Sequence, residues 1–217
     1  MNFNYPIKKT LFPEKRNRPD VVKKRGLWKK AFWNIVLKRL VFIDESGVNL
    51  SQTRLYGRAP SNERVNDYVP DARFERKSIL VALKLNGQMS SLLFSGSLNG
   101  KLFIQYIKEF LSQILNNGDI VVIDNASAHK VAGVKEAIEA LGAKVLYLPA
   151  YSPDFNPVEL LWSKVKAILR KLKARTFQAL EDALKLALDY VSVSEPLLKI
   201  SFKFEYTGFF IKRTRCD

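Results

Sequence analysis

Two acidic residues that follow short apolar runs could together bind a metal ion. Asp44 ends the run VFID, and Asp124 ends the run IVVID. Two ionised carboxylates that lie close together repel each other, so each tends to keep a proton unless a cation lies between them. Carboxylate oxygens are hard ligands that suit Mg²⁺ or Mn²⁺. The pair indicates metal-dependent chemistry, and Glu45 is a weaker candidate because neighbouring strand residues point to opposite faces.

Glu159 is the candidate third acid, at the start of a predicted helix. Asn156 is a good N-cap, Pro157 suits the first helical position, and Glu159 falls at the third. The same spacing allows a second interpretation, in which Glu159 only closes a capping box with Asn156. Asp154 competes as the third ligand, although its SPD context is also simple turn chemistry. On local sequence alone, the capping role is favoured for Glu159.

The elements that must position these acids alternate along the chain. Hydrophobic periodicity predicts, in order, a strand at 40–44, two strands at 78–87 and 88–97 joined at Asn86-Gly87, a helix at 102–115, a strand at 119–124, a helix at 131–141, a strand at 143–150, and helices at 158–173 and 176–193. This order predicts an α/β fold with a mixed sheet, parallel later strands and flanking helices. Open α/β sheets place their sites at the carboxyl ends of such strands.

The composition indicates a single basic domain that binds a polyanion. The 217 residues, 47% of them hydrophobic, suit one buried core, and the net charge of +15 makes nucleic acid the default partner, ahead of an anionic membrane surface. Residues 1–39 carry twelve basic residues against two acids, and so ten of the fifteen net charges. A basic amphipathic helix is predicted there. Its Trp28 and Trp33 could stack on bases, but burial is favoured because aromatic side chains mostly bury.

Cysteine content and hydropathy indicate in which cellular compartment the protein functions. Cys216 is the only cysteine and His129 the only histidine, so neither a disulfide framework nor a zinc site is expected. The N-terminus has no apolar core of a secretory signal, and no apolar run approaches the length of a membrane span. These features predict a soluble intracellular protein with no membrane partner.

Longer motifs surround all three acids. VFIDESG precedes LYGRAP at 55–60, and DNASAHK at 124–130 precedes LPAYSPDFNPVE at 148–159, with 34 residues between Asp124 and Glu159. Over roughly residues 5–190 the chain resembles the catalytic domain of DDE transposases of the mariner-like superfamily, most closely its bacterial insertion-sequence branch, the six-thirty family. The resemblance implies a ribonuclease H-like fold, with Asp44, Asp124 and Glu159 as the catalytic, metal-binding acids.

The function implied by this resemblance is cut-and-paste transposition of an insertion sequence. Two Mg²⁺ or Mn²⁺ ions, about 3.5–4 Å apart in such sites, would serve cleavage and strand transfer. Asp44 would bridge the ions, while Asp124 and Glu159 each complete one site. Transposon ends and target DNA are the implied partners of a homodimer in the bacterial cytoplasm, associated with the nucleoid. An upstream helix-turn-helix unit is also expected, because residues 1–39 have room for at most one convincing helix.

Several further residues are candidates for contacts with DNA. Asn125 and His129 match the DN…H pattern of the family, and we expect them beside the metals, touching phosphate or orienting a ligand; loop bracing is the alternative for His129. A run of six basic residues without an acid between Leu160 and Arg175 predicts a phosphate-facing surface. The remaining candidates are Lys164, Lys166 and Arg170 in that run, and Arg58 and Lys77 by position. Trp162 belongs to an apolar stripe and is expected in the core.

The predicted organisation is a basic N-terminal extension at 1–39, a catalytic domain at 40–193 and an atypical tail at 194–217. The tail departs from the family pattern, which leaves open an inactive remnant that only binds DNA non-specifically. Another ribonuclease H-like or junction-cutting nuclease would share the fold and the metals. A basic RNA- or ribosome-bound protein is the last alternative, but it would not need acids at strand ends.

Overall fold

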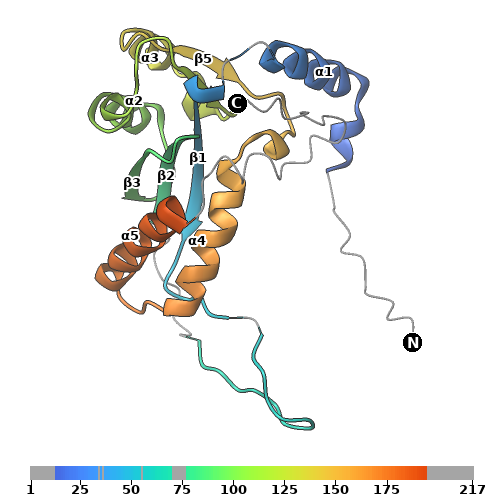
Figure 1. Cartoon of the computed structure of the whole chain (residues 1–217), viewed down its shortest axis with the longest axis vertical. Coiled ribbons are helices and arrows are strands. Elements are labelled where there is room, and N and C mark those ends of the chain that lie inside the picture. The colour runs from blue at the N-terminus through green and yellow to red at the C-terminus, as the bar shows by residue number, and fades with distance from the viewer. Residues whose placement is uncertain (1–12, 34, 36, 55, 70–76, 195–217) are drawn as a thin grey trace, which may run out of the picture.

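The computed structural model describes residues 13–33, 35, 37–54, 56–69 and 77–194 (Figure 1). The predicted tail at 194–217 lies outside the described residues except for Ser194, and the side chain of Trp33 is likewise not described. Among the helices of this described part, none is long and apolar enough to cross a membrane.

One mixed five-stranded sheet forms the centre of the molecule. Its strands are β1 (Leu40–Val48), β2 (Lys77–Lys84), β3 (Met89–Ser95), β4 (Ile120–Ile123) and β5 (Lys144–Tyr147). Their spatial order is β3-β2-β1-β4-β5, with β1, β2 and β3 antiparallel and β1, β4 and β5 parallel. The predicted mixed sheet with parallel later strands is confirmed.

The hairpin between β2 and β3 follows from its turn residues. Lys84 and Gln88 close the turn with a backbone hydrogen bond of 2.9 Å, and Gly87 adopts a φ of +95°. Glycine reaches that left-handed region without steric cost, which is why Asn-Gly predicts a tight hairpin.

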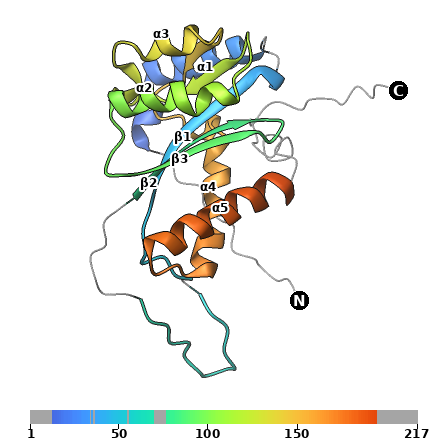
Figure 2. The same ribbon diagram turned by 90° about the vertical axis from the view of Figure 1, so that its left-hand side faces the viewer.

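Helices cover both faces of the sheet and give it two cores (Figures 1 and 2). One face packs against α2 (Gly100–Glu109) and α3 (Val134–Glu139), and the other against α4 (Val158–Leu172) and α5 (Phe177–Ser194). The basic helix α1 (Pro19–Trp33) joins the second core through buried Trp28. Short 3-10 helices complete the described elements: Glu14–Asn17, Leu37–Arg39, Leu111–Gln113, Ser127–Lys130 and Pro153–Phe155.

Several elements differ in length from the sequence prediction: the helix predicted at 102–115 ends at Glu109, and the strand predicted at 143–150 ends at Tyr147. β1 continues past Asp44 to Val48, because antiparallel pairing with β2 extends to the Val48–Lys77 pair. The helix predicted at 131–141 begins only at Val134, because Gly133 has a φ of +93° and interrupts the helical conformation just before it. The differences at β1 and at Val134 come from strand pairing and backbone geometry that the apolar periodicity does not report.

An extended arm connects β1 to β2. Residues 49–54 and 56–69 contain no helix or strand, and they project beyond the C-terminal end of α4 (Figure 1). The arm is tied to that end by Arg175, which donates to the carbonyl oxygens of Leu50 at 2.7 Å and Gln52 at 3.2 Å, and by an ion pair between Lys173 and Asp67. It lies at the opposite end of α4 from Glu159.

Candidate active site

The strands direct Asp44 and Asp124 to the same face of the sheet. Parallel pairing of β1 with β4 ends at Phe42 and Val122, both of which pack in the core under α4. Side chains alternate along a strand, so the acids two residues further on, Asp44 and Asp124, face the same side and continue the same register. Asp44 lies within β1 rather than at its end, but it emerges where β4 stops.

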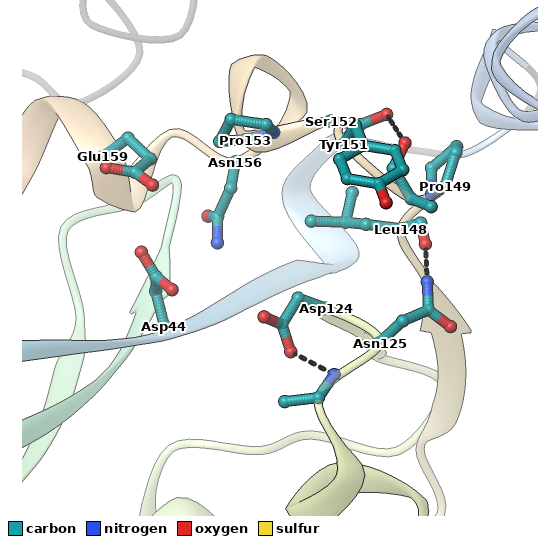
Figure 3. Close-up of a pocket in the computed structure, with 12 residues that line it drawn as sticks. Asp44, Asp124, Asn125, Leu148, Pro149, Tyr151, Ser152, Pro153, Asn156 and Glu159 are labelled. Carbon is teal, nitrogen blue, oxygen red and sulfur yellow. Dashed lines mark hydrogen bonds between the residues drawn. The ribbon is translucent and has the colours of Figure 1, made fainter. Parts of the chain in front are cut away.

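Glu159 completes a group of three acids around one open pocket, called here the acidic pocket (Figure 3). Figure 3 shows Glu159 above Asp44, with Asp124 facing them from the end of β4. The pocket is lined by Asp44, Asp124, Asn125, Ala126, Leu148, Pro149, Ala150, Tyr151, Ser152, Pro153, Asn156 and Glu159. The structure thus brings together three acids that are up to 115 positions apart in sequence, from Asp44 to Glu159.

Asp44 is the most perturbed of the three acids. Burial raises its pKa from 3.8 to about 7, and the negative charges of Glu159 and Asp124 add to that effect. The indole nitrogen of Trp162 opposes the rise by donating to Asp44 Oδ2 at 3.0 Å. A carboxylate that is costly to ionise beside two other acids is a position where a cation would be stabilising.

The pKa of Asp124 is shifted downward by His129, in the opposite direction to that of Asp44. His129 Nδ1 lies 2.6 Å from Asp124 Oδ1, and since a carboxylate only accepts, Nδ1 carries the hydrogen. This bond lowers the pKa of Asp124 against the effect of partial burial, with help from the backbone amide of Ala126. His129 is 3% exposed, and its ring packs against Phe103. Its side chain therefore lies beneath the pocket, which favours the ligand-orienting interpretation over contact with phosphate.

The start of α4 shows why Glu159 is available to the pocket. Asn156 Oδ1 accepts from the amide of Val158 at 3.2 Å, but the N-cap of α4 is Pro157, one residue later than predicted. The amide of Asn156 donates to the carbonyl of Pro153 and so does not serve as the donor of a capping box. Glu159 as a whole residue is exposed to solvent, but its carboxylate is partly shielded by the pocket. This partial desolvation raises the pKa of Glu159, and the positive charge of Lys166 opposes the rise. The structure therefore places Glu159 in the pocket and shows no capping box with Asn156.

Asp154, the competing third ligand, is engaged elsewhere. Arg25 holds both of its carboxylate oxygens, at 3.0 and 2.7 Å, and Arg16 donates to Oδ2 at 3.0 Å. Asp154 does not line the acidic pocket. Its role in the structure is to anchor the loop, in keeping with the turn interpretation.

The remaining candidates fall into two groups. Asn125 lines the pocket and its amide donates to the carbonyl of Leu148, which ties β4 to β5. Lys164, Lys166 and Arg170 are all partly exposed on α4, the helix that carries Glu159. By contrast, Arg58 is exposed on the projecting arm, and Lys77 lies at the far end of β2, 4.8 Å over the ring of Phe177. The structure does not bring these last two to the pocket.

Two residues beside the pocket were missed by sequence reasoning. Trp162 is buried as expected, but its indole also bonds Asp44. Its spacing of three from Glu159 was a usable signal, because helix positions i and i+3 share a face. Arg25 bonds the loop before Glu159, and nothing in its local sequence distinguishes it from the lysines around it.

The carboxylates that line the pocket have the chemistry of ligands for hard divalent cations. Within the described residues, no three histidine, cysteine or acidic side chains are placed to hold one ion together. The raised pKa of Asp44 beside both partners is the observation that favours cations there.

The sequence matches the family described as DDE superfamily endonuclease over residues 39–181, more than half of the chain. The chain belongs to the DDE superfamily endonucleases. Asp44, Asp124 and Glu159 all fall inside the matched residues of this DDE endonuclease. No curated protein matches the sequence significantly.

Solved structures of Mos1 transposase share the fold of this DDE endonuclease. The "Mos1 transposase paired-end complex with left transposon end" aligns at a TM-score of 0.74 and 17% identity, covering 93% of this chain and 64% of that one. The catalytic domain of Mos1 mariner transposase aligns at 0.54 and 15% identity, covering 91% and 98%. The chain therefore spans about two-thirds of the longer Mos1 chain, and the predicted ribonuclease H-like fold is confirmed.

Proposed function

We propose that this chain is a transposase catalytic domain that cleaves DNA strands and joins them to a target. The single observation that carries this function is the meeting of Asp44, Asp124 and Glu159 around one open pocket, from β1, β4 and α4 of a DDE endonuclease. The solved neighbours support the substrate, because one is a Mos1 complex with a transposon end and another is the Mos1 strand transfer complex.

The side chains around the pocket have separable tasks in this proposal. Asp44 is close enough to the other two acids for their charges to raise its pKa, and Trp162 donates to one of its oxygens. His129 fixes one oxygen of Asp124, which leaves the other free for a ligand. Two bound Mg²⁺ or Mn²⁺ ions would supply a nucleophile of lowered pKa and neutralise charge on the phosphate. The protein contributes position and charge, which dominate catalysis of phosphoryl transfer.

The basic face of α4 supports a DNA path that leads to the pocket. At 100° per residue, Lys166 and Arg170 fall on the same face of α4 as Glu159. Lys166 is close enough to lower the pKa of Glu159. Cations aligned in this way neutralise phosphates without reading bases, so they position DNA rather than select its sequence. Lys164 lies on a different side of the helix.

Finer features of the proposal rest on the motif resemblance. They are membership of the bacterial six-thirty branch, use of two ions, assembly of a homodimer on DNA, association with the nucleoid, and end recognition by a helix-turn-helix unit. The divisions at 39 and 194 are also proposals. Neighbouring Mos1 structures with Mg and with Mn support the choice of metal.

A nicking assay tests the function directly. Wild-type protein should cleave duplex DNA with Mg²⁺ or Mn²⁺, and should not cleave an RNA–DNA hybrid as a ribonuclease H would. Asp44→Asn, Asp124→Asn and Glu159→Gln should each abolish cleavage with DNA affinity largely retained, since each removes one ligand of a metal pair. Glu45→Gln is the matched control, because Glu45 is exposed on the opposite face of β1. Full activity in excess EDTA, or in Glu159→Gln, would refute the proposal.

A further inference from the structure

The basic helix α1 is anchored to the active-site loop by a buried arginine. Arg25 is 8% exposed, although it lies within a run of exposed lysines. Its Nη1 donates to Ser152 Oγ at 2.5 Å and to the carbonyl of Tyr151 at 3.5 Å, and its two Nη atoms hold both oxygens of Asp154. One side chain from α1 thus bonds three residues of the loop at 151–154: Tyr151, Ser152 and Asp154.

Aromatic packing reinforces the same contact. Phe155, the next residue of the loop, is 2% exposed, and its ring stacks on Trp28 of α1 at 4.8 Å and 11°. Trp28 stacks in turn on Phe32 at 4.7 Å. The guanidinium carbon of Arg25 lies 4.1 Å from the centre of the Phe155 ring. The planar guanidinium therefore bonds Asp154 and covers Phe155 at once, which a lysine ammonium cannot do.

The anchored loop leads directly to two catalytic acids through Asn156. Asn156 follows Phe155 and is 3% exposed. Its Nδ2 donates to the carbonyl of Ile43 at 3.2 Å, next to Asp44, and its Oδ1 accepts from the amide of Val158, next to Glu159. The position of Glu159 relative to Asp44 therefore depends on Asn156. Asn156 is held by its own two hydrogen bonds and by the contacts of the preceding residues, Asp154 and Phe155, with α1.

We propose that Arg25 is a positioning residue which, through Asp154 and Phe155, holds the loop that sets Glu159 opposite Asp44. This inference rests on the proposed function, and it makes α1 part of the catalytic machinery rather than only a basic extension that binds DNA. If either Arg25 or Asp154 is removed, the partner that remains is left with an uncompensated charge. The loop at 151–154 is therefore sensitive to a change in either residue. Loosening it should weaken metal binding at the pair formed by Asp44 and Glu159.

Arg25→Met tests the inference against Lys24→Met as its matched control. Both changes remove one positive charge from α1, but Lys24 is exposed. Mn²⁺ binding is measured by electron paramagnetic resonance on the protein alone, and DNA cleavage is measured as a function of Mn²⁺ concentration. Arg25→Met should weaken Mn²⁺ binding about ten- to a hundredfold, the usual effect of losing a group that supports metal ligands. Raising the Mn²⁺ concentration should restore part of the cleavage in protein that circular dichroism shows to be folded already without metal, so that refolding by bound metal does not account for the rescue.

Arg25→Lys keeps the charge and decides the question if Arg25→Met fails to fold, as judged by circular dichroism. It should show the same shift in Mn²⁺ requirement, because it lacks the planar fork. Equal Mn²⁺ binding and cleavage by folded Arg25 variants and Lys24→Met would overturn the inference while leaving the proposed function intact. A wild-type chain that neither binds Mn²⁺ nor cleaves DNA would overturn the proposed function and, with it, this inference.

Discussion

Replacing Trp162 with phenylalanine removes one hydrogen bond to Asp44 and keeps an aromatic ring in the core. Trp162 is 4% exposed, and its indole donates to Asp44 Oδ2 at 3.0 Å. A hydrogen bond to a charged group contributes about 1.5–3 kcal/mol, which corresponds to roughly 10- to 150-fold in an equilibrium constant. Because this bond lowers the pKa of Asp44, its loss should raise that pKa further above about 7. Fewer molecules then carry an ionised Asp44 at neutral pH, and metal binding weakens.

The assay is cleavage as a function of Mg²⁺ concentration at pH 7 and pH 8.5. Trp162→Phe should need about tenfold or more Mg²⁺ for half-maximal cleavage at pH 7, and less excess at pH 8.5, where a larger fraction of Asp44 is ionised. Leu161→Val is the control for lost packing, because Leu161 is fully buried beside Trp162 and has no polar group to bond an acid. If the Mg²⁺ curves of folded Trp162→Phe and wild type coincide at pH 7, the role given to the indole is wrong.

Three further outcomes follow from the same geometry. An acid with a raised pKa binds more protons when folded, so without metal the free energy of unfolding should fall as pH rises from 3.8 to about 7. In urea titrations with EDTA, Asp44→Asn should gain up to roughly 4 kcal/mol over wild type across that range. If the difference in free energy of unfolding between Asp44→Asn and wild type does not change with pH, the raised pKa of Asp44 is contradicted. His129→Gln should lower cleavage about ten- to a hundredfold and leave DNA affinity unchanged, since His129 is buried. If fluorescence anisotropy shows that DNA affinity falls by the same factor as cleavage, His129 contacts DNA directly. The chain should bind DNA of any sequence, with an affinity that falls steeply as the salt concentration rises. Lys166→Gln or Arg170→Gln should each reduce the slope of log affinity against log salt by about one, whereas the control Lys185→Gln on α5 should not. A preference above about a hundredfold for the terminal repeat over scrambled DNA would show sequence readout that phosphate contacts cannot supply.

Local patterns in the sequence were enough to predict the elements that carry the acids. Apolar runs predicted the strands that became β1 and β4, and Asn86-Gly87 predicted the hairpin turn. These signals involve neighbours within a few residues, so they survive without knowledge of tertiary partners. The motifs around Asp44, Asp124 and Glu159 predicted which acids would meet, and the structure places all three at one pocket.

Only the tertiary structure decided how those acids are held. β1 runs beyond Asp44 because β2 pairs with it there. Trp162 bonds Asp44 across 118 positions of the chain, Arg25 bonds Asp154 across 129, and Asn156 bonds Ile43 across 113. Residue type and periodicity show that a side chain is apolar, basic or suited to a cap, but not which distant polar atom it reaches. Those partners are set by the packing of α1 and α4 against the sheet, because burial leaves each polar group to find its hydrogen bond inside the fold.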